Sequence, residues 1–269
     1  MQLPSASFLG YNGFSKQING CSILLTSYEA ISEFEEWHSH QNSSISLLLS
    51  GAYNEEFGGK VKYRIPGDIK FIPEGQIHRC TNYATGTLTI NLDLGPFFAG
   101  QTASTSECIE KMIAQQEPQS KFILLKLFKE IQDKDSYVEA SAQLLLYELL
   151  CPPDNRKAPP SDKKKKPKWV AAIREQLNDG WDDKPDLGQL TRIAGIHPVS
   201  LSRYFPQYFG MTLSAYMRQL KVDRSLTLIR SSQLSLTGIA YKCGFADQAH
   251  FTRVFKQTTG FLPKDFKKI

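Results

Sequence analysis

A segment near the end of the chain carries side chains of the types that contact nucleic acid. Phe251, Val254 and Phe255 recur at helical spacing, so they define the buried face of a helix. The types near the opposite face include arginine, which can bind guanine O6 and N7, and glutamine, which suits adenine. These residues are Gln248, Ala249, His250, Thr252, Arg253 and Lys256. The pattern indicates a helix suited to a groove of double-stranded DNA.

The residues just before this helix predict the element that positions it. Leu236, Ile239, Ala240 and Cys243 form one apolar helical stripe, and Gly244 breaks it. The order is therefore helix, tight turn, helix.

The same pattern occurs a second time about fifty residues upstream. Arg203 matches Arg253, and seven positions around each match once the second copy is given one more turn residue. The matched pairs are Leu187 and Leu236, Leu190 and Ile239, Gly195 and Gly244, Leu201 and Phe251, Phe205 and Phe255, Gly210 and Gly260, and Tyr216 and Phe266. Such a repeat predicts two equivalent structural units.

The run Gly-Phe-x-Asp-x-x-x-Phe-x-Arg-x-Phe-Lys at residues 244–256, with Gly260 and Pro263 after it, resembles the AraC/XylS class of bacterial transcription regulators. The resemblance covers roughly residues 168–268. It implies a sequence-specific DNA-binding regulator, more often an activator than a repressor, that forms a homodimer and responds to a small-molecule effector. A contact with RNA polymerase is left open, and no enzymatic activity or cofactor is expected.

The resemblance also implies roles for individual residues. The base-facing residues would be Val199, Ser202, Arg203, Gln248, Ala249, His250 and Arg253. Thr252 and Lys256 would contact the DNA backbone. Two alternatives stay open. In one, Arg203 or Arg253 contacts phosphate alone, which supports affinity without specificity, and in the other His250 is a solvated surface residue. We expect weaker base discrimination by the first unit, because Pro198-Val199-Ser200 replaces the bulkier or amide side chains common in the class.

A long helix is expected between the two units. Residues 212–230 contain no proline or glycine. Such a helix spans roughly 30 Å, close to the ~34 Å of one DNA turn. It would act as a spacer that sets both groove-facing helices in successive major-groove windows.

Charge and composition agree with a nucleic-acid partner for the second half of the chain. The 269 residues have a net charge of +5, but residues 163–269 carry net +11 and residues 1–162 carry net −6. The five cysteines are scattered and include no Cys-x-x-Cys pair, so a disulfide scaffold is not expected. No apolar run is long enough to cross a membrane, and the start lacks a signal-peptide pattern, so we predict a cytoplasmic protein without a membrane partner.

The first hundred residues read as short strands separated by turns. The predicted strands are Cys21–Ser27, Ser44–Leu49, Val61–Arg64, Ile69–Ile72 and Thr87–Leu94. Regular turns without long helices suggest a barrel or jelly roll. The spacing Gly67-x5-Pro73-x-Gly75-x2-His78-x3-Asn82 resembles the second signature of the cupin superfamily.

The first cupin signature is only half present. His38-Ser39-His40 matches its His-x-His, but Gln41-Asn42-Ser43-Ser44-Ile45 stands where an acidic residue is expected. On a strand the two histidines point to one face and could converge with His78. Three imidazoles can hold zinc or iron, so these three are metal candidates, but we predict no metal and an effector pocket instead. Its predicted residues are Trp37, His38, His40, Tyr53, Phe71 and His78.

Helical patterns begin after residue 104. Helices are expected over 107–116, 121–132 and 136–150, and the last two have wide apolar stripes. These stripes either pack on the barrel or form a dimer contact through an antiparallel helix pair. The predicted dimer residues are Leu124, Leu127, Leu145 and Leu149.

Together these patterns predict an α+β fold in two domains. A cupin-like, effector-sensing β-barrel or jelly roll over 1–100 is followed by a helical dimerisation segment over 101–150. A Pro- and Lys-rich linker over 151–168 leads to an all-α double helix-turn-helix domain over 169–269. The alternatives are a metal-dependent cupin enzyme with an appended DNA-binding module, and a regulator whose barrel binds no ligand.

Overall fold

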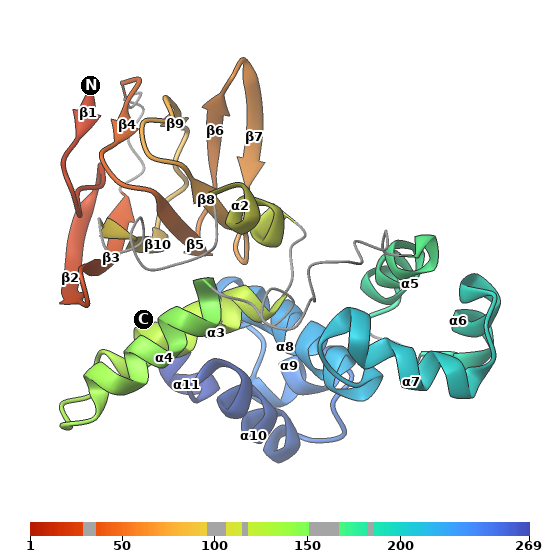
Figure 1. Cartoon of the computed structure of the whole chain (residues 1–269). Coiled ribbons are helices and arrows are strands. Elements are labelled where there is room, and N and C mark those ends of the chain that lie inside the picture. The colour runs from red at the N-terminus through yellow and green to blue at the C-terminus, as the bar shows by residue number, and fades with distance from the viewer. Residues whose placement is uncertain (29–35, 96–105, 115–117, 151–166, 182–184) are drawn as a thin grey trace. The chain divides into compact units, whose positions relative to one another are not determined.

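The computed structural model describes residues 1–28, 36–95, 106–114, 118–150, 167–181 and 185–269 (Figure 1). The chain divides into two compact units, called here the N-terminal unit, mainly residues 1–152, and the C-terminal unit, mainly the residues that follow. The predicted linker over 151–168 lies outside the described residues except for its last two positions. No helix of the described ranges has both the length and the apolar composition that a membrane crossing requires.

The largest sheet of the N-terminal unit is antiparallel and five-stranded, in the order β2-β3-β10-β5-β8. Its strands are β2 (Tyr11–Ile18), β3 (Cys21–Tyr28), β5 (Ser44–Ser50), β8 (Ile69–Ile72) and β10 (Thr87–Asp93). Ile45 on β5, and Ile90 and Leu92 on β10, are fully buried. The near-continuous apolar run of β5 therefore belongs to a strand that is covered on both faces.

Two smaller sheets complete the strand structure that the described residues show. β6 (Tyr53–Phe57) pairs with β7 (Lys60–Arg64) and with β9 (Arg79–Thr81), while β1 (Gln2–Leu3) pairs in parallel with β4 (Ser39–His40). His38 and His78 form an isolated bridge through two backbone hydrogen bonds of 2.9 and 2.8 Å. This bridge joins the two histidine motifs.

The helices of the N-terminal unit pack on each other and on its edge strand. They are α2 (Ser106–Ala114), α3 (Pro118–Glu130) and α4 (Val138–Leu150). Phe14 of β2 contacts Phe128 edge-to-face, with ring centroids 5.6 Å apart, and the Lys16 ammonium donates to the Ile131 carbonyl. α3 is thereby held against β2.

The structure corrects most of the predicted dimer surface. Leu124, Leu127 and Leu149 are buried in the chain itself, because α3 and α4 pack together, and only Leu145 is half-buried. Leu144, one position earlier on α4, is 71% exposed. The apolar stripes of α3 and α4 therefore face the protein interior to a larger extent than expected.

The C-terminal unit is entirely helical where it is described (Figure 1). Its helices are α5 (Lys168–Asp179), α6 (Leu187–Ala194), α7 (Pro198–Phe209), α8 (Leu213–Ser231), α9 (Leu236–Lys242), α10 (Gln248–Thr259) and α11 (Pro263–Phe266). Asp186 caps α6 by accepting a hydrogen bond from the Gly188 N–H, at 2.8 Å.

The turns inside the two helix pairs share one backbone conformation. Gly195 between α6 and α7 has φ 65°, and its counterpart Gly244 between α9 and α10 has φ 69°. This left-handed region carries little penalty for glycine, and it explains why glycine occupies both positions. The sequence repeat is thus matched by a repeat of local structure.

Candidate nucleic-acid interface and ligand pocket

A buried aromatic face determines which side of α10 points outward. Phe251 and Phe255 are fully buried, and the Asp247 carboxylate accepts from the His250 N–H at 2.7 Å, which caps the start of the helix. This arrangement leaves the other face to the predicted groove residues. Gln248, Ala249, Arg253 and Lys256 are exposed, and His250 and Thr252 are half-buried.

Two of these side chains are oriented by neighbours. The Thr237 hydroxyl of α9 donates to the Gln248 amide oxygen. The His250 ring packs edge-to-face on Phe245, with centroids 5.5 Å apart. The start of α10 therefore presents partly ordered polar groups, which lowers the entropy cost of a contact.

α7 has the same design on a different core. Leu201, Phe205 and Phe209 are buried, and the Phe205 and Phe209 rings stack at 4.0 Å. The three groove residues predicted for the first unit lie on the outward face and are exposed: Val199, Ser202 and Arg203. The exposed isopropyl group of Val199, at 70%, offers an apolar contact rather than a hydrogen bond.

α8 connects the two helix pairs and supports both. It has 19 residues, which corresponds to a length of about 28 Å. Tyr216, Met217 and Leu220 of its first half belong to the core that holds α7. Because its buried residues lie around most of its circumference, α8 works as an internal rod.

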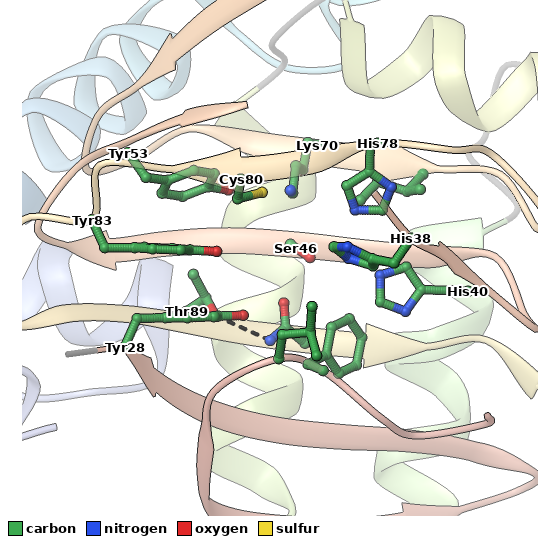
Figure 2. Close-up of a pocket in the computed structure, with 14 residues that line it drawn as sticks. Tyr28, His38, His40, Ser46, Tyr53, Lys70, His78, Cys80, Tyr83 and Thr89 are labelled. Carbon is green, nitrogen blue, oxygen red and sulfur yellow. Dashed lines mark hydrogen bonds between the residues drawn. The ribbon is translucent and has the colours of Figure 1, made fainter. Parts of the chain in front are cut away.

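The N-terminal unit contains a small polar pocket between its sheets (Figure 2). Tyr28, Tyr53 and Tyr83 lie on one side of it, His38, His40 and His78 on the other, and Lys70 and Ser46 lie between them. The free space is about 20 Å³, room for one or two water molecules.

Four of the six predicted effector residues line this pocket, and two do not. His38, His40, His78 and Tyr53 line it. Phe71 is absent from the lining because side chains alternate along β8, so that Lys70 and Ile72 face inward. Trp37 is 41% exposed, and its ring lies under the Arg79 guanidinium at 4.8 Å. Both are corrections to the predicted pocket.

The three histidines converge as their spacing predicted. Ring centroids are 4.4 Å apart for His38 and His78, and 5.3 Å apart for the other two pairs. Nδ1 of His38 lies 2.9 Å from the Glu36 carbonyl, and Nδ1 of His78 lies 3.1 Å from the Gln76 carbonyl. Because a carbonyl only accepts, each Nδ1 carries the proton, and each Nε2 is left with a lone pair.

Burial keeps these imidazoles neutral. Burial lowers the pKa of His40 to about 4 and that of His78 to about 3, with smaller contributions from nearby positive groups including Lys70. Burial also lowers the pKa of His38. Three imidazoles that are neutral at neutral pH can act either as hydrogen-bond partners or as metal ligands.

The donor set fits a metal ion in geometry but not in charge. One nitrogen from each histidine lies within 4.8 Å of the others, as three ligands of one ion require. The Lys70 ammonium, however, lines the same pocket. Glu55, the carboxylate that lies within 4.8 Å of His78 and Cys80, is held by two cations instead. We therefore keep the prediction that the pocket holds no metal.

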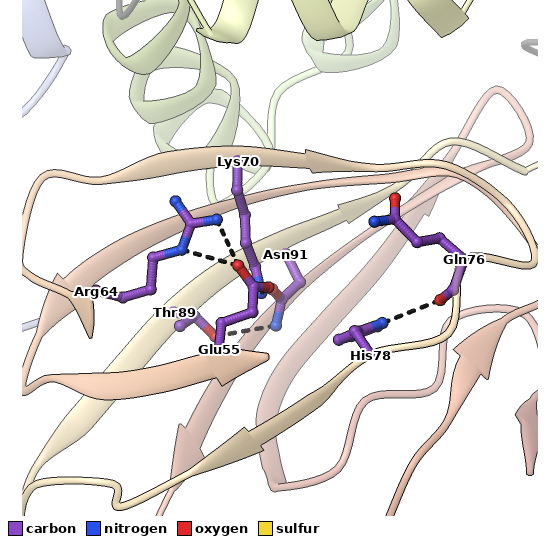
Figure 3. A network of polar contacts seen from close by, with 7 residues as sticks. All are labelled: Glu55, Arg64, Lys70, Gln76, His78, Thr89 and Asn91. Carbon is purple, nitrogen blue, oxygen red and sulfur yellow. Dashed lines mark hydrogen bonds and ion pairs between the residues drawn. The ribbon is translucent and has the colours of Figure 1, made fainter. Parts of the chain in front are cut away.

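That ion cluster is the feature of the pocket that sequence reasoning missed (Figure 3). Glu55 on β6 pairs with Arg64 on β7 and with Lys70 on β8, and all three side chains are at most 11% exposed. Burial alone would raise the pKa of Glu55, but Lys70 and Arg64 lower it to about 2. The available signal was a lysine at an inward-facing position of a predicted strand.

The histidine cluster predicts a specific loss of stability in mild acid. In the unfolded chain His40 and His78 take up a proton near pH 6.5, whereas in the folded chain they do so only near pH 4 and pH 3, so protonation favours unfolding. The stabilisation is complete above pH 6.5 and is lost as the pH falls toward 4 and 3. Hydrogen exchange of the β5 and β10 amides, measured in chelator-treated protein, should show this loss of stability. A His40→Gln variant with unchanged pH dependence between 6.5 and 4.5 would contradict this explanation.

Comparison with protein families gives a match within the C-terminal unit. Residues 190–269 match a family described as a helix-turn-helix domain. The HTH-type transcriptional activator RhaR of Yersinia pestis bv. Antiqua (strain Angola) is 36% identical over 69 residues, 26% of this chain and 24% of the relative. RhaS of Escherichia coli (strain SE11), also an HTH-type transcriptional activator, is 35% identical over 92 residues, 34% of this chain and 33% of the relative. The chain spans a quarter to a third of the length of these relatives.

Among solved structures, the C-terminal domain of AraT, a response regulator from Geobacillus stearothermophilus, is similar over 38% of this chain and 84% of its own, with 22% identity and a TM-score of 0.34. ToxT from Vibrio cholerae is similar over 91% of this chain and 98% of its own, with 11% identity and a TM-score of 0.36. The family match falls on the helix pairs described above. Residues 190–269 of this chain therefore form a helix-turn-helix domain.

Proposed function

We propose that this chain is a sequence-specific DNA-binding transcription regulator of the AraC/XylS class, and that it acts as an activator. The observation that carries the proposal is the structural repeat inside the matched domain. α7 and α10 follow equivalent glycine turns, each has a buried aromatic face, and each exposes an arginine at the matched position. Relatives named as transcriptional activators are similar to the chain over 69 and 92 residues.

In the proposed complex α7 and α10 enter successive major-groove windows. The length of α8, about 28 Å, is close to the ~34 Å between such windows on one face of the duplex. Arg203 and Arg253 read guanine, while Lys256 and other cationic residues of 163–269, a segment with a net charge of +11, bind phosphate. One chain then reads a long, asymmetric site.

We assign effector sensing to residues 1–100, with the polar pocket as its site. The tyrosine and histidine walls with Lys70 between them offer both donors and acceptors for a polar effector. Because the free space is only about 20 Å³, binding would require these walls to move apart. Its occupation would change how the sensor and the DNA-binding domain over 169–269 are related, across the linker over 151–168.

A homodimer contact is proposed through the helical segment over 101–150. Since Leu124, Leu127 and Leu149 are buried, the contact would use the outward face of α4. Leu144 is 71% exposed on α4, and Tyr137, just before the helix, is 73% exposed. Leu145 is half-buried. RNA polymerase remains a further partner to be tested.

The proposal is tested by selecting duplexes that the full-length protein binds from a random-sequence library. We expect enrichment of one extended sequence rather than uniform retention. The enriched duplex should be bound about a thousandfold or more tightly than an unrelated duplex at physiological salt. Retention of all sequences alike would contradict a sequence-specific regulator.

A second candidate function is a metal-dependent cupin enzyme with an appended DNA-binding module. The convergence of His38, His40 and His78 favours it, and the Lys70 ammonium in the same pocket opposes it. Iron, manganese or zinc bound in a one-to-one ratio, and lost in the His38→Ala/His40→Ala variant, would support the enzyme.

A further inference from the structure

The C-terminal unit contains a cavity that the proposed DNA contacts do not explain. It has a volume of about 340 Å³, which lies within the ~300–1,000 Å³ typical of small-molecule pockets. It is formed by the start of α6, the first half of α8 and the turn between α9 and α10. The pocket of the N-terminal unit, at about 20 Å³, is far smaller.

One part of the cavity wall is apolar. Met217 and Phe245 are buried, Leu213 is half-buried, and Leu187 is 46% exposed at the opening. An apolar ligand body placed here would cover the exposed leucine surface without displacing a buried polar group. The cavity therefore has the lining that an alkyl or aryl group requires.

The other part of the wall is cationic. Arg218 is exposed, and the Lys221 ammonium donates to the Gly244 carbonyl at 2.9 Å, which fixes the position of its charge. An ammonium has three N–H donors, so this bond leaves donors for a ligand. None of the described residues that line the cavity is acidic. The charge of the lining is thus complementary to one negative group.

We infer that this cavity binds a small amphiphilic monoanion, an alkyl or aryl carboxylate, with its apolar body against Met217 and Phe245 and its carboxylate at Arg218 and Lys221. A guanidinium and an ammonium on successive turns of α8 suit the two oxygens of a carboxylate. This site is separate from the proposed effector pocket and goes beyond the proposed function.

Two neighbouring features extend the assignment. A second cavity of about 290 Å³ shares Leu187, Leu213 and Ser214 with the first, so a longer alkyl chain can continue into it. The His250 ring also lines the first cavity and rests on Phe245. An occupant would therefore contact the groove-facing start of α10.

The test is titration of the full-length protein with octanoate, followed calorimetrically in the absence of DNA. Octanoate should bind, whereas octanol and octylammonium, which have the same chain but no negative charge, should bind at least about tenfold more weakly. The Arg218→Gln and Lys221→Gln variants should each weaken octanoate binding about five- to tenfold. Lys264→Gln, which removes an exposed charge on α11 away from the cavity, should leave it unchanged.

A blocking variant locates the site independently. Ser214 is exposed and lines both cavities, so Ser214→Trp should reduce octanoate binding without unfolding the protein, as circular dichroism can verify. Tyr53→Phe in the N-terminal pocket should leave octanoate binding unchanged. The inference is overturned if octanoate does not bind up to about 10 mM, if octanol binds equally well, or if neither Ser214→Trp nor the two charge variants weaken binding.

Discussion

Replacing Glu55 with glutamine is expected to destabilise the N-terminal unit by about 3–5 kcal/mol. The substitution leaves Arg64 and Lys70 buried together without a counter-charge, and both side chains are at most 11% exposed. Burial opposes the charged form of Lys70, and Glu55 is the main group that keeps its pKa well above the ordinary value. Hydrogen exchange of the β5 and β10 amides measures the loss within this unit.

The neighbouring glutamate provides a matched control. Glu56 lies on the same strand and pairs with Arg79, but these side chains are 26% and 32% exposed. Solvent screens this pair, so Glu56→Gln should cost no more than about 1 kcal/mol. Equal losses for Glu55→Gln and Glu56→Gln would contradict the structural role given to the buried cluster.

Replacing Arg253 with alanine is expected to reduce discrimination between the selected duplex and mismatched duplexes by about 1–3 kcal/mol. Arg253 is exposed on the outward face of α10, where the proposed bidentate contact to guanine would form. Its loss removes two hydrogen bonds that depend on the base, so affinity for the matched duplex should fall more than affinity for the others. Competition binding at one fixed salt concentration measures the difference.

Lys256 is the matched comparison on the same helix. It is also exposed, but it lies one helical turn nearer the end of α10 and is assigned to phosphate. Lys256→Ala should weaken binding to all duplexes alike and reduce the salt dependence by about one counter-ion. If Arg253→Ala behaves in the same way, Arg253 contacts phosphate and the alternative described for it is correct.

The extent to which the fold could be predicted depended on apolar content. Strands such as Ile69–Ile72 were predicted with their bounds, since apolar residues at alternate positions bounded by turns leave a clear pattern. β6 was missed because Tyr-Asn-Glu-Glu-Phe reads as a polar loop, and β9 because it has only three residues. β2 was missed because it is an exposed edge strand with little apolar residue content.

The candidate sites also divide into features that a local sequence pattern records and features that it does not. The histidine cluster was predictable because His38 and His40 are two residues apart and His78 belongs to a recognisable signature. The Glu55 cluster was not, because its members come from three strands whose pairing no local pattern records. Three of the four predicted dimer leucines are buried within the chain for a related reason: periodicity identifies an apolar face but does not tell which partner covers it.

The measurement that tests the central claim most directly is methylation protection of guanine N7 in the selected duplex. We expect, within each bound site, two protected major-groove windows about 10 to 11 base pairs apart on one face. Protection in one window should disappear with Arg203→Ala and in the other with Arg253→Ala. A single protected window, or two windows on opposite faces of the duplex, would contradict the account of two groove-reading helices joined by α8.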